Sequence, residues 1–215
     1  MKKLIIIGAS GFGREVAWLV ERINKEKPTW NLIGFIDDNP KIQGWIINGY
    51  PVIGDCNSLK NIQDAFVVCA VGASKVRKSI IDKICSINPK IDFATLIDPS
   101  VEISDFVKIG KGTIICAHTI ITVNIEIGSH VIINLDCTIG HDAVLHDFVT
   151  LYPSVNVSGA TDIGECSELG TGMQIIQGKS VGSNSIVGAG AVVIKDIPEK
   201  CTAVGSPAKP IKYFN

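Results

Sequence analysis

The strongest constraint on this chain is a repeat of six residues over positions 101–196. When this segment is divided into sixteen hexapeptides, the third residue is Ile, Leu or Val in every one, from Ile103 to Val193. In a chain that is 46% hydrophobic, such a run arises by chance with a probability of about 4 in a million. An α-helical stripe repeats every ~3.6 residues and does not fit this period. The pattern predicts a solenoid in which three hexapeptides close one triangular coil.

Each hexapeptide is expected to supply a short strand and a corner. The apolar third residue points inward and stacks on the residue one coil further along. The fourth residue is glycine in seven hexapeptides, and we expect it to supply a positive φ or a close backbone approach at the corners. Residues 99–215 are therefore predicted to form a β-helix domain with a C-terminal cap.

Residues 1–98 do not keep this repeat. The segments KKLIIIG, NLIGFIDDNP and AFVVCAVGAS have the pattern of buried strands, and IDFATLI leads into the coils. Helices are predicted over 8–23 and 75–85, the first with an apolar face of Val16, Leu19, Val20 and Ile23. Strands that alternate with helices predict a small Rossmann-like parallel α/β sheet as a separate domain over residues 1–98.

A glycine-rich turn follows the first predicted strand. Gly8, Gly11 and Gly13 are spaced G-x-x-G-x-G, unlike the dinucleotide fingerprint G-x-G-x-x-G. Backbone amides at such a turn bind anions, and an acid at the end of the next strand, here Asp37 or Asp38, accepts hydrogen bonds from a ribose or a base. The domain is long enough for one mononucleotide-binding half. Taken alone, the motif also fits a tight turn without a ligand.

Composition narrows the partners and the compartment. Lys and Arg total 20 against 21 Asp and Glu, so there is no broad cationic surface for nucleic acid. The start MKKLIIIGAS opens like a signal peptide, but its apolar run stops at Gly8, and no stretch reaches the length of a membrane span. The seven cysteines are widely spaced and form no CxxC pair, which favours free thiols. We expect a cytoplasmic protein without a nucleic-acid or membrane partner.

Several short motifs occur in order along the chain: GASGFG, FIDD, AVGAS, the unbroken hexapeptides, IGHD and VGSPAK. The hexapeptides resemble those of the acyltransferases whose solenoid is a left-handed parallel β-helix. The whole set resembles the bacterial sugar acetyltransferases that include nucleotide-linked 4-amino-sugar N-acetyltransferases and sialic acid O-acetyltransferase-like proteins. The resemblance covers nearly the whole chain.

This resemblance implies an activity and a site. The front domain would hold a nucleotide-linked amino sugar of the 4-amino-4,6-dideoxy type, for surface glycan synthesis. Acetyl-CoA would lie between neighbouring β-helices of a homotrimer, and no metal is expected. The implied general base is His141, with Asp142 raising its basicity. The implied contacts to the nucleotide-sugar are Ser10, Gly11, Phe12, Gly13, Asp37, Asp38 and Gly72. The implied contacts to acetyl-CoA are Thr150, Gly159, Thr171, Ala189 and Lys209.

The C-terminal segment GSPAKPI resembles the G-x-P-A-K-x-I tail of acetyl-CoA-dependent members. It also fits a loop that caps the open end of the solenoid. Both roles are compatible, with Lys209 and Lys212 near a cofactor phosphate. Some relatives carry histidine where this chain has Phe12 and Thr150.

His141 is the fifth residue of its hexapeptide, at a corner where a side chain can point outward. Gly159, one coil later, is expected to leave space for an acyl group. A neutral imidazole at this corner can accept the proton of an amine or a hydroxyl that attacks a thioester. Adjacent residues of a straight strand point to opposite faces, so the contact with Asp142 requires the corner to bend.

The remaining histidines receive other interpretations. His118 and His130, in the sixth position, are expected at the surface, and His146 is expected to be structural or peripheral. The stretch IGHDAVLH also resembles the β-helical carbonic anhydrases, in which two histidines five apart, here His141 and His146, bind zinc with a third ligand. The position of that third ligand is Asp105 in this chain.

Three further alternatives concern the chemistry. A hydroxyl acceptor would make the protein a sugar O-acetyltransferase of the sialic-acid or capsule type. A nucleophilic Cys137 is disfavoured because its position in the repeat faces the packed coil. The chain can also be read as a scaffold or ligand-sensing solenoid without turnover.

Overall fold

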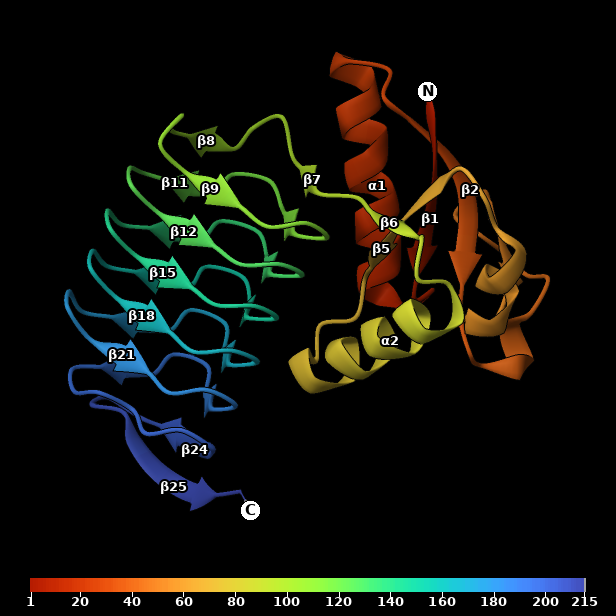
Figure 1. Cartoon of the computed structure of the whole chain (residues 1–215). Coiled ribbons are helices and arrows are strands. Elements are labelled where there is room, and N and C mark those ends of the chain that lie inside the picture. Colours follow the sequence, from red (N-terminus) through yellow and green to blue (C-terminus); the bar gives the residue numbers. More distant parts are fainter. Residues whose placement is uncertain (215) are drawn as a thin grey trace.

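The structure is a computed structural model that describes residues 1–214, with an α/β domain beside a β-helix (Figure 1). The α/β sheet has the strand order β3-β4-β2-β1-β5-β6. Its parallel strands are β1 (Lys2–Ile7), β2 (Trp30–Ile36), β4 (Tyr50–Gly54), β5 (Ala65–Cys69) and β6 (Asp92–Phe93). The short β3 (Ile46–Ile47) is antiparallel to β4. No helix within residues 1–214 is long and apolar enough to cross a membrane.

Two helices cover opposite faces of this sheet: α1 (Gly11–Glu26) and α2 (Ser74–Ile87). Alternate residues of β1 point to opposite faces, as in any strand. Leu4 and Ile6 pack in the same apolar cluster as α1, whereas Ile5 and Ile7 pack in the cluster that contains α2 residues. The predicted Rossmann-like α/β sheet is confirmed.

The β3–β4 hairpin and the strand β4 were not predicted. Asn48 and Gly49 form the turn between them, with φ angles of 48° and 85°. Asn-Gly between two short strands is the strongest short-range signal of a hairpin, so the signal was present in the sequence. Two short 3₁₀ helices, Pro40–Ile42 and Cys56–Asn61, flank the hairpin.

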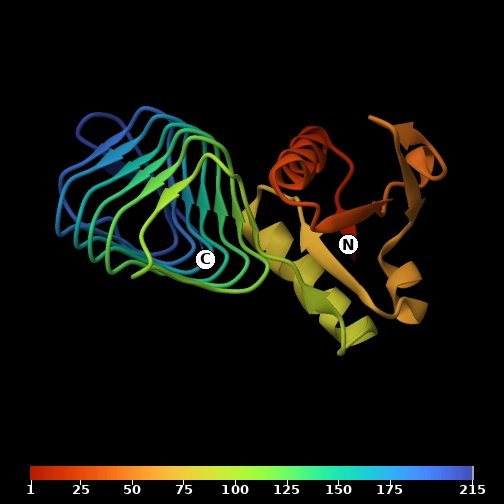
Figure 2. The same ribbon diagram turned by 90° about the horizontal axis from the view of Figure 1, so that it is seen from above.

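The β-helix has three sheet faces, seen along its axis in Figure 2. The docking face, which carries the α/β domain, contains β7 (Leu96–Ile97), β10 (Ile114–Ile115), β13 (Ile132–Ile133), β16 (Thr150–Leu151), β19 (Glu168–Leu169), β22 (Ile186–Val187), β24 (Cys201–Val204) and β25 (Lys209–Tyr213). The second face contains β8 (Glu102–Ile103), β11 (Ile120–Ile121), β14 (Thr138–Ile139), β17 (Asn156–Val157), β20 (Gln174–Ile175) and β23 (Val192–Val193). The third contains β9 (Lys108–Ile109), β12 (Glu126–Ile127), β15 (Val144–Leu145), β18 (Asp162–Ile163) and β21 (Ser180–Val181).

Each of the sixteen hexapeptides supplies one two-residue strand, β8 to β23, as the repeat predicts. From Ile115 to Val193, every third-position residue is buried in the core of the β-helix. Ile103 is 37% exposed because it lies in the first coil, at the open end of the stack. The strand β7 precedes residue 99 and pairs with β10, so the docking face begins just before the hexapeptides.

The corners are formed differently from the prediction. The sixth residue of each hexapeptide from Gly112 to Gly190 is left-handed, with φ between 52° and 73°. The fourth-position glycines have no positive φ, so that part of the prediction is wrong. They allow a close approach between coils: a Cβ at Gly140 would lie 2.6 Å from the backbone nitrogen of Gly159.

A buried arginine joins the two domains. Arg77 of α2 is 1% exposed, and its guanidinium donates across the junction to the carbonyl oxygens of His130 (2.9 Å) and Phe148 (2.8 Å) and to the hydroxyl of Thr150 (2.9 Å). On its own side, Nη1 donates to the carbonyls of Val71 (2.7 Å) and Gly72 (2.9 Å). Burial lowers the pKa of Arg77 to about 10, which leaves it charged at neutral pH.

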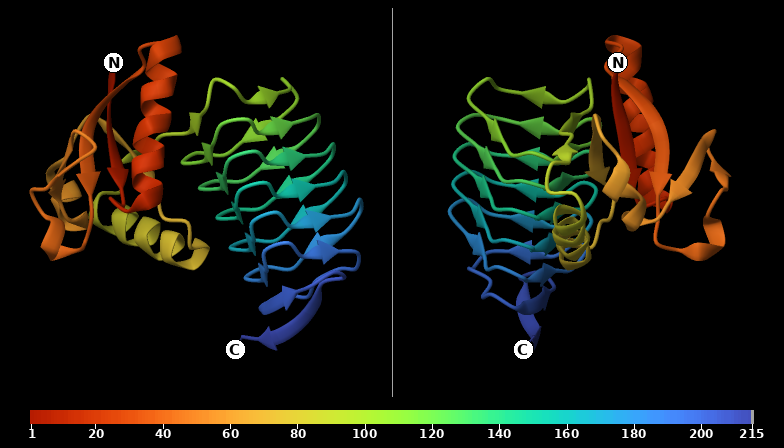
Figure 3. Two further views of the ribbon diagram at one scale, coloured as in Figure 1. Left: turned by 180° about the vertical axis from the view of Figure 1, so that it is seen from behind. Right: turned by 45° about the vertical axis from the view of Figure 1, so that its right-hand side comes forward.

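A second polar contact ties α1 to the first coil. Arg22 binds Asp98 through two hydrogen bonds, Nε to Oδ2 at 2.6 Å and Nη2 to Oδ1 at 3.0 Å. The Asp98 side chain is 1% exposed. Burial by itself would raise the pKa of Asp98, but the hydrogen bonds from Arg22 and Ser100 outweigh it and hold that pKa below its usual value. Both helices of the α/β domain thus contact the docking face through an arginine. Figure 3 shows the two domains side by side from two further directions.

His130 lies in this junction, so the expectation of a surface position is wrong. It is 4% exposed, and its ring stacks on Phe148 at 5.1 Å and meets the edge of Phe93 at 4.7 Å between centroids. Burial, aided by Lys111 and Arg77, lowers the pKa of His130 to about 4. The ring is therefore neutral at neutral pH. His118, by contrast, is exposed as predicted.

Replacing Arg77 by Met should destabilise the protein by at least about 3 kcal/mol, because several buried carbonyls lose their donor. Urea unfolding followed by circular dichroism measures the change. Lys78→Met is the matched control on the same helix, since Lys78 is more exposed and makes two long ion pairs, 3.6 Å to Glu165 and 3.9 Å to Asp82, and a cation–π contact with Phe148 at 4.9 Å. Equal losses in the two variants would contradict the role given to Arg77.

Candidate active site

His141 and Asp142 form a contact at the corner between β14 and β15. Nδ1 of His141 lies 2.8 Å from Oδ2 of Asp142, and both side chains are about half exposed. The contact forms because Asp142 has a φ of 60°, which turns its side chain back toward its neighbour. An ionised carboxylate only accepts, so Nδ1 carries the proton of the neutral ring and Nε2 keeps its lone pair. The basic nitrogen of His141 is thus Nε2, which does not contact Asp142.

The His141 ring packs directly against Gly159, so there is no empty space at this position. A Cβ on Gly159 would lie 2.5 Å from Nε2 and 2.6 Å from Cε1 of His141. The space expected for an acyl group is therefore taken by the imidazole itself. Gly159 has no positive φ, so glycine is needed here for close packing and not for its backbone freedom.

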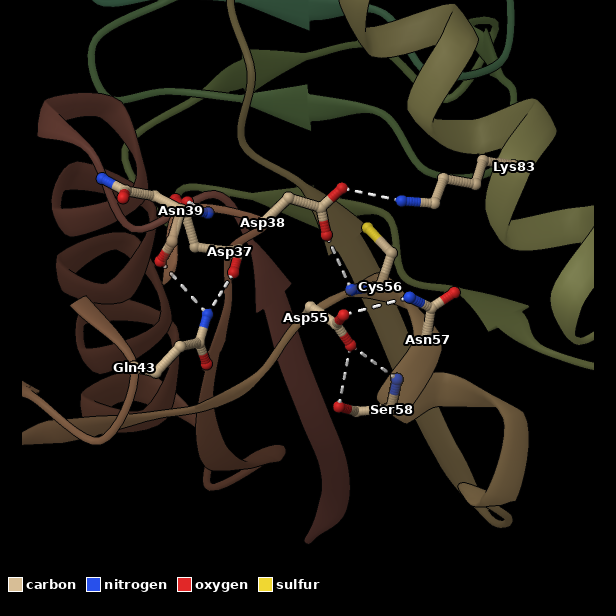
Figure 4. Close-up of polar contacts among 9 residues, drawn as sticks. All are labelled: Asp37, Asp38, Asn39, Gln43, Asp55, Cys56, Asn57, Ser58 and Lys83. Atoms are coloured by element: carbon tan, nitrogen blue, oxygen red, sulfur yellow. Dashed lines mark hydrogen bonds and ion pairs between the residues drawn. The ribbon is translucent and has the colours of Figure 1, made fainter. Parts of the chain in front are cut away.

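Asp37 lies against the glycine turn. It follows β2 directly, and its Oδ2 accepts from the backbone N–H of Ala9 at 2.9 Å, while Oδ1 accepts from that of Asn39 at 2.9 Å. The side chain of Gln43 donates to the carbonyl of Asp37 at 2.6 Å (Figure 4). Asp37 and the turn after β1 thus meet at one edge of the sheet, as parallel neighbouring strands predict.

Asp38 points elsewhere, toward α2 (Figure 4). Its Oδ2 forms an ion pair with Lys83 at 2.8 Å, and its Oδ1 accepts from the backbone N–H of Cys56 at 2.9 Å. The hydrogen bonds from Cys56 and Lys83 lower the pKa of Asp38. Both oxygens are engaged, so the two adjacent acids have separate surroundings and only Asp37 contacts the glycine turn.

The two helices of the α/β domain differ at their N-termini. Within residues 1–214, α1 has no side-chain cap from Ser10 and no acidic residue in its first turn. Ser10 and Gly11 are exposed and Phe12 is half-buried. The N-terminus of α2 is occupied instead, because Oε1 of Glu168 accepts from the Ser74 backbone at 2.8 Å and from its hydroxyl at 2.9 Å. The uncapped amides of α1 are the ones suited to an anion.

Four of the five residues expected to contact acetyl-CoA lie at three places. Gly159 shares the corner between the second and third faces with His141. Thr171 and Ala189 are exposed at the other edge of the second face, one coil apart. Lys209 is exposed on β25 at the C-terminal end of the stack. One chain therefore presents Gly159 at one edge of its second face and the Thr171–Ala189 pair at the other edge.

Thr150 is not exposed on either edge. It lies on the docking face, 1% exposed, and its hydroxyl donates to the Gly72 carbonyl at 2.8 Å and accepts from Arg77. Gly72 is expected to contact the nucleotide-sugar; it follows β5 and is half-buried. The side chain of Thr150 thus serves the domain junction.

His146 lies at the corner between the third face and the docking face. Its Nε2 is 3.3 Å from Oδ1 of Asp162, and it lines a cavity of about 440 Å³ with Lys108, Glu126 and Glu165 among others. His146 and His141 thus each contact a different carboxylate. Within residues 1–214, no group of three or more His, Cys, Asp or Glu side chains is arranged to hold a metal ion.

Three residues of the domain junction were not identified from the sequence: Arg77, Tyr152 and Glu168. Tyr152 donates to Oε2 of Glu168 at 3.0 Å. The contacts of these residues join segments more than fifty residues apart or neighbouring coils. No local sequence pattern predicts such contacts. The outward position of Glu168 on the docking face was the only available signal.

Comparisons with known proteins find similar proteins over nearly the whole length of this chain. A family model described as the PglD N-terminal domain matches residues 3–84. A GDP-perosamine N-acetyltransferase of Escherichia coli is 28% identical, over 96% of this chain and 95% of its own length.

Two solved structures match equally completely. The acetyltransferase domain of PglB from Neisseria gonorrhoeae, in complex with acetyl coenzyme A, is 35% identical with a TM-score of 0.89, covering 98% of this chain and 99% of its own. A variant of perosamine N-acetyltransferase from Caulobacter crescentus, in which asparagine replaces a histidine, was solved in complex with CoA and GDP-perosamine. It is 27% identical with a TM-score of 0.89, covering 99% of this chain and 98% of its own.

Replacing Gly159 by Ala should lower kcat at least about 10-fold, because the added methyl displaces the His141 ring from its position. Steady-state turnover and thermal unfolding measure activity and folding separately. In a His141→Asn background the same substitution should cause no further loss of kcat, since the displaced imidazole is already absent. A normal kcat in the folded Gly159→Ala protein would contradict this arrangement.

Proposed function

This chain belongs to the hexapeptide-repeat sugar acetyltransferases, and we propose that it transfers the acetyl group of acetyl-CoA to the amino group of a nucleotide-linked 4-amino sugar. The observation that carries the substrate class is the uncapped N-terminus of α1 beside Asp37. This arrangement suits a diphosphate and a ribose. The relatives matched over nearly their full length include one named for GDP-perosamine.

The chemistry follows from the His141–Asp142 pair. The neutral amine of the sugar attacks the thioester carbon while Nε2 of His141 takes one of its protons. The negative charge that develops on the carbonyl oxygen collapses to expel the CoA thiolate, which receives the proton from His141. Asp142 fixes the ring with the proton on Nδ1 and stabilises the imidazolium that forms transiently. The products are an amide and free CoA.

The cofactor groove requires a second copy of the chain. Gly159 and the Thr171–Ala189 pair lie at opposite edges of the second face, so a cofactor between two β-helices would contact one edge of each. Exposed apolar residues follow this face and its His141 edge: Phe106, Ile120, Val123, Ile176 and Ile194. Exposed apolar residues that gather on one face favour an assembly contact. We propose a homotrimer with acetyl-CoA in each of three grooves and Lys209 near a cofactor phosphate.

The setting of the reaction is part of the same proposal. All seven cysteines are free thiols, and six of them are buried. Free thiols suit a reducing compartment, so we place the enzyme in the cytoplasm. There it would prepare an activated amino sugar for surface glycan synthesis.

Release of CoA thiol over a panel of UDP-, GDP- and dTDP-linked 4-amino sugars, the matching free sugars and serine tests the activity. We expect kcat/KM to be at least about 100-fold higher for one nucleotide-linked amine, because the bound nucleotide holds the amine at the base. An acetyl ester in the product would indicate O-acetylation instead. Acetyl-CoA binding without turnover on any acceptor would favour the scaffold alternative.

The roles of named residues are tested with the best acceptor of that panel. His141→Asn should lower kcat roughly 100-fold, the size expected for a lost general base. Asp37→Ala should raise KM for the nucleotide-sugar and leave KM for acetyl-CoA unchanged. Asp38→Ala is the matched control, since it loses the Lys83 ion pair and should lower Tm more than it raises that KM. Equal KM effects at Asp37 and Asp38 would contradict the assignment.

Assembly is tested by light scattering of the active protein, which should give three times the chain mass. Val123→Asp places a charge one coil before His141 and should reduce both the measured mass and the turnover. Ile46→Lys, on the exposed edge strand of the α/β domain, should change neither. A monomeric mass in an active preparation would contradict the shared groove.

A further inference from the structure

Tyr152 is a β-helix residue that lies near the C-terminal ends of the parallel strands of the α/β sheet. It follows β16 on the docking face and is half-buried. Its hydroxyl oxygen lies 3.7 Å from the position that a Cβ would take on Gly72, which follows β5. The end of β1 adjoins the same segment, because a Cβ on Gly8 would lie 3.2 Å from the Ala70 carbonyl oxygen. Tyr152 therefore lies at the sheet edge that carries the glycine turn.

The hydroxyl of Tyr152 uses its proton but can still accept a hydrogen bond. Its proton is donated to Oε2 of Glu168 at 3.0 Å. Burial, and the charge of Glu168, raise the pKa of Tyr152 to about 12, so the hydroxyl stays protonated. Oε1 of Glu168 already accepts from Ser74 twice. The oxygen of Tyr152 keeps its lone pairs, and an oxygen that donates to a carboxylate is a strengthened acceptor.

The strand order tells which part of the substrate reaches this oxygen. The sheet runs β2-β1-β5, with Asp37 after β2, the uncapped helix α1 after β1, and Gly72 after β5. A diphosphate at the N-terminus of α1 separates two sides. The ribose and base extend toward Asp37 on the β2 side. The remaining group, the sugar, then extends toward Gly72 and Tyr152 on the side of the β-helix.

We propose that the Tyr152 oxygen accepts a hydrogen bond from a hydroxyl or amino group of the sugar, and so selects the sugar that is linked to the nucleotide. This role rests on the proposed function. Glu168 acts through Tyr152 as a positioning residue, since it orients the hydroxyl proton away from the sugar. The other oxygen of the same carboxylate caps α2.

Tyr152→Phe tests this role with the best nucleotide-linked amine and its matching nucleoside diphosphate. The variant keeps the ring and loses one hydrogen bond to the sugar, so KM for the nucleotide-sugar should rise about 10-fold. The calorimetric Kd of the nucleoside diphosphate and KM for acetyl-CoA should change less than about 2-fold. An unchanged KM for the nucleotide-sugar, or an equal loss for the nucleoside diphosphate, would overturn the proposal.

Ser74→Ala is the matched control for a purely structural effect. It removes a different donor to Glu168 and leaves Tyr152 intact. We expect a lower Tm with an unchanged KM for the nucleotide-sugar. If Ser74→Ala raises this KM as much as Tyr152→Phe, the effect comes from the junction and the proposal fails. Absence of turnover and binding by the wild-type protein with every nucleotide-sugar would instead contradict the proposed function, and with it the role of Tyr152.

Discussion

The relative position of the two domains depends on the buried guanidinium of Arg77, whose hydrogen-bond partners are all neutral. Arg77 contacts carbonyl oxygens and one hydroxyl, and within residues 1–214 it forms no ion pair with a carboxylate. A charge in such a place is tolerated only when its donors are satisfied with good geometry. Because these acceptors belong to both domains, the two domains must hold one relative position for the charge to be satisfied. The carboxyl edge of the α/β sheet is thereby fixed against the docking face.

The junction also makes the N-termini of the two helices different. Both helices of the α/β domain begin near this edge, and both carry partial positive charge at their first amides. Glu168 reaches across from the β-helix and occupies the one that begins α2. Within the described residues, the first amides of α1 have no such side-chain cap. A single carboxylate of β19 thus distinguishes the two helix N-termini, and the proposed diphosphate site is at the one that it leaves uncapped.

The repeat was sufficient to predict β8 to β23, because each strand needs only its own apolar residue and a neighbour one coil away. The His141–Asp142 contact also followed from local sequence, given a bent corner, although the catalytic roles stay predictions. The position of His130 did not follow. Sixth-position residues lie at corners, and only the docked α/β domain makes this corner an interior. The hairpin at Asn48 and Gly49, by contrast, is marked by a local Asn-Gly signal.

Other features needed information from distant segments. The contacts of Arg77 and Glu168 join residues more than fifty positions apart, and nothing in the pattern of α2 distinguishes a buried arginine from an exposed one. Asp37 and Asp38 are adjacent and chemically identical. Their separate surroundings arise because one faces the turn after β1 and the other faces α2 and the segment after β4.

The two ends of the β-helix are not equivalent. At the C-terminal end, β25 runs antiparallel to β24 and closes the docking face, and its exposed edge carries Lys209, Pro210 and Lys212. Lysine and proline on an edge strand discourage pairing with another strand. The first coil has no such cover, and Ile103 is partly exposed there. Head-to-tail stacking of β-helices would pair the first coil of one chain with β25 of another. The lysines and the proline of β25 oppose this pairing, so the regular sheets do not continue from one molecule into a fibre.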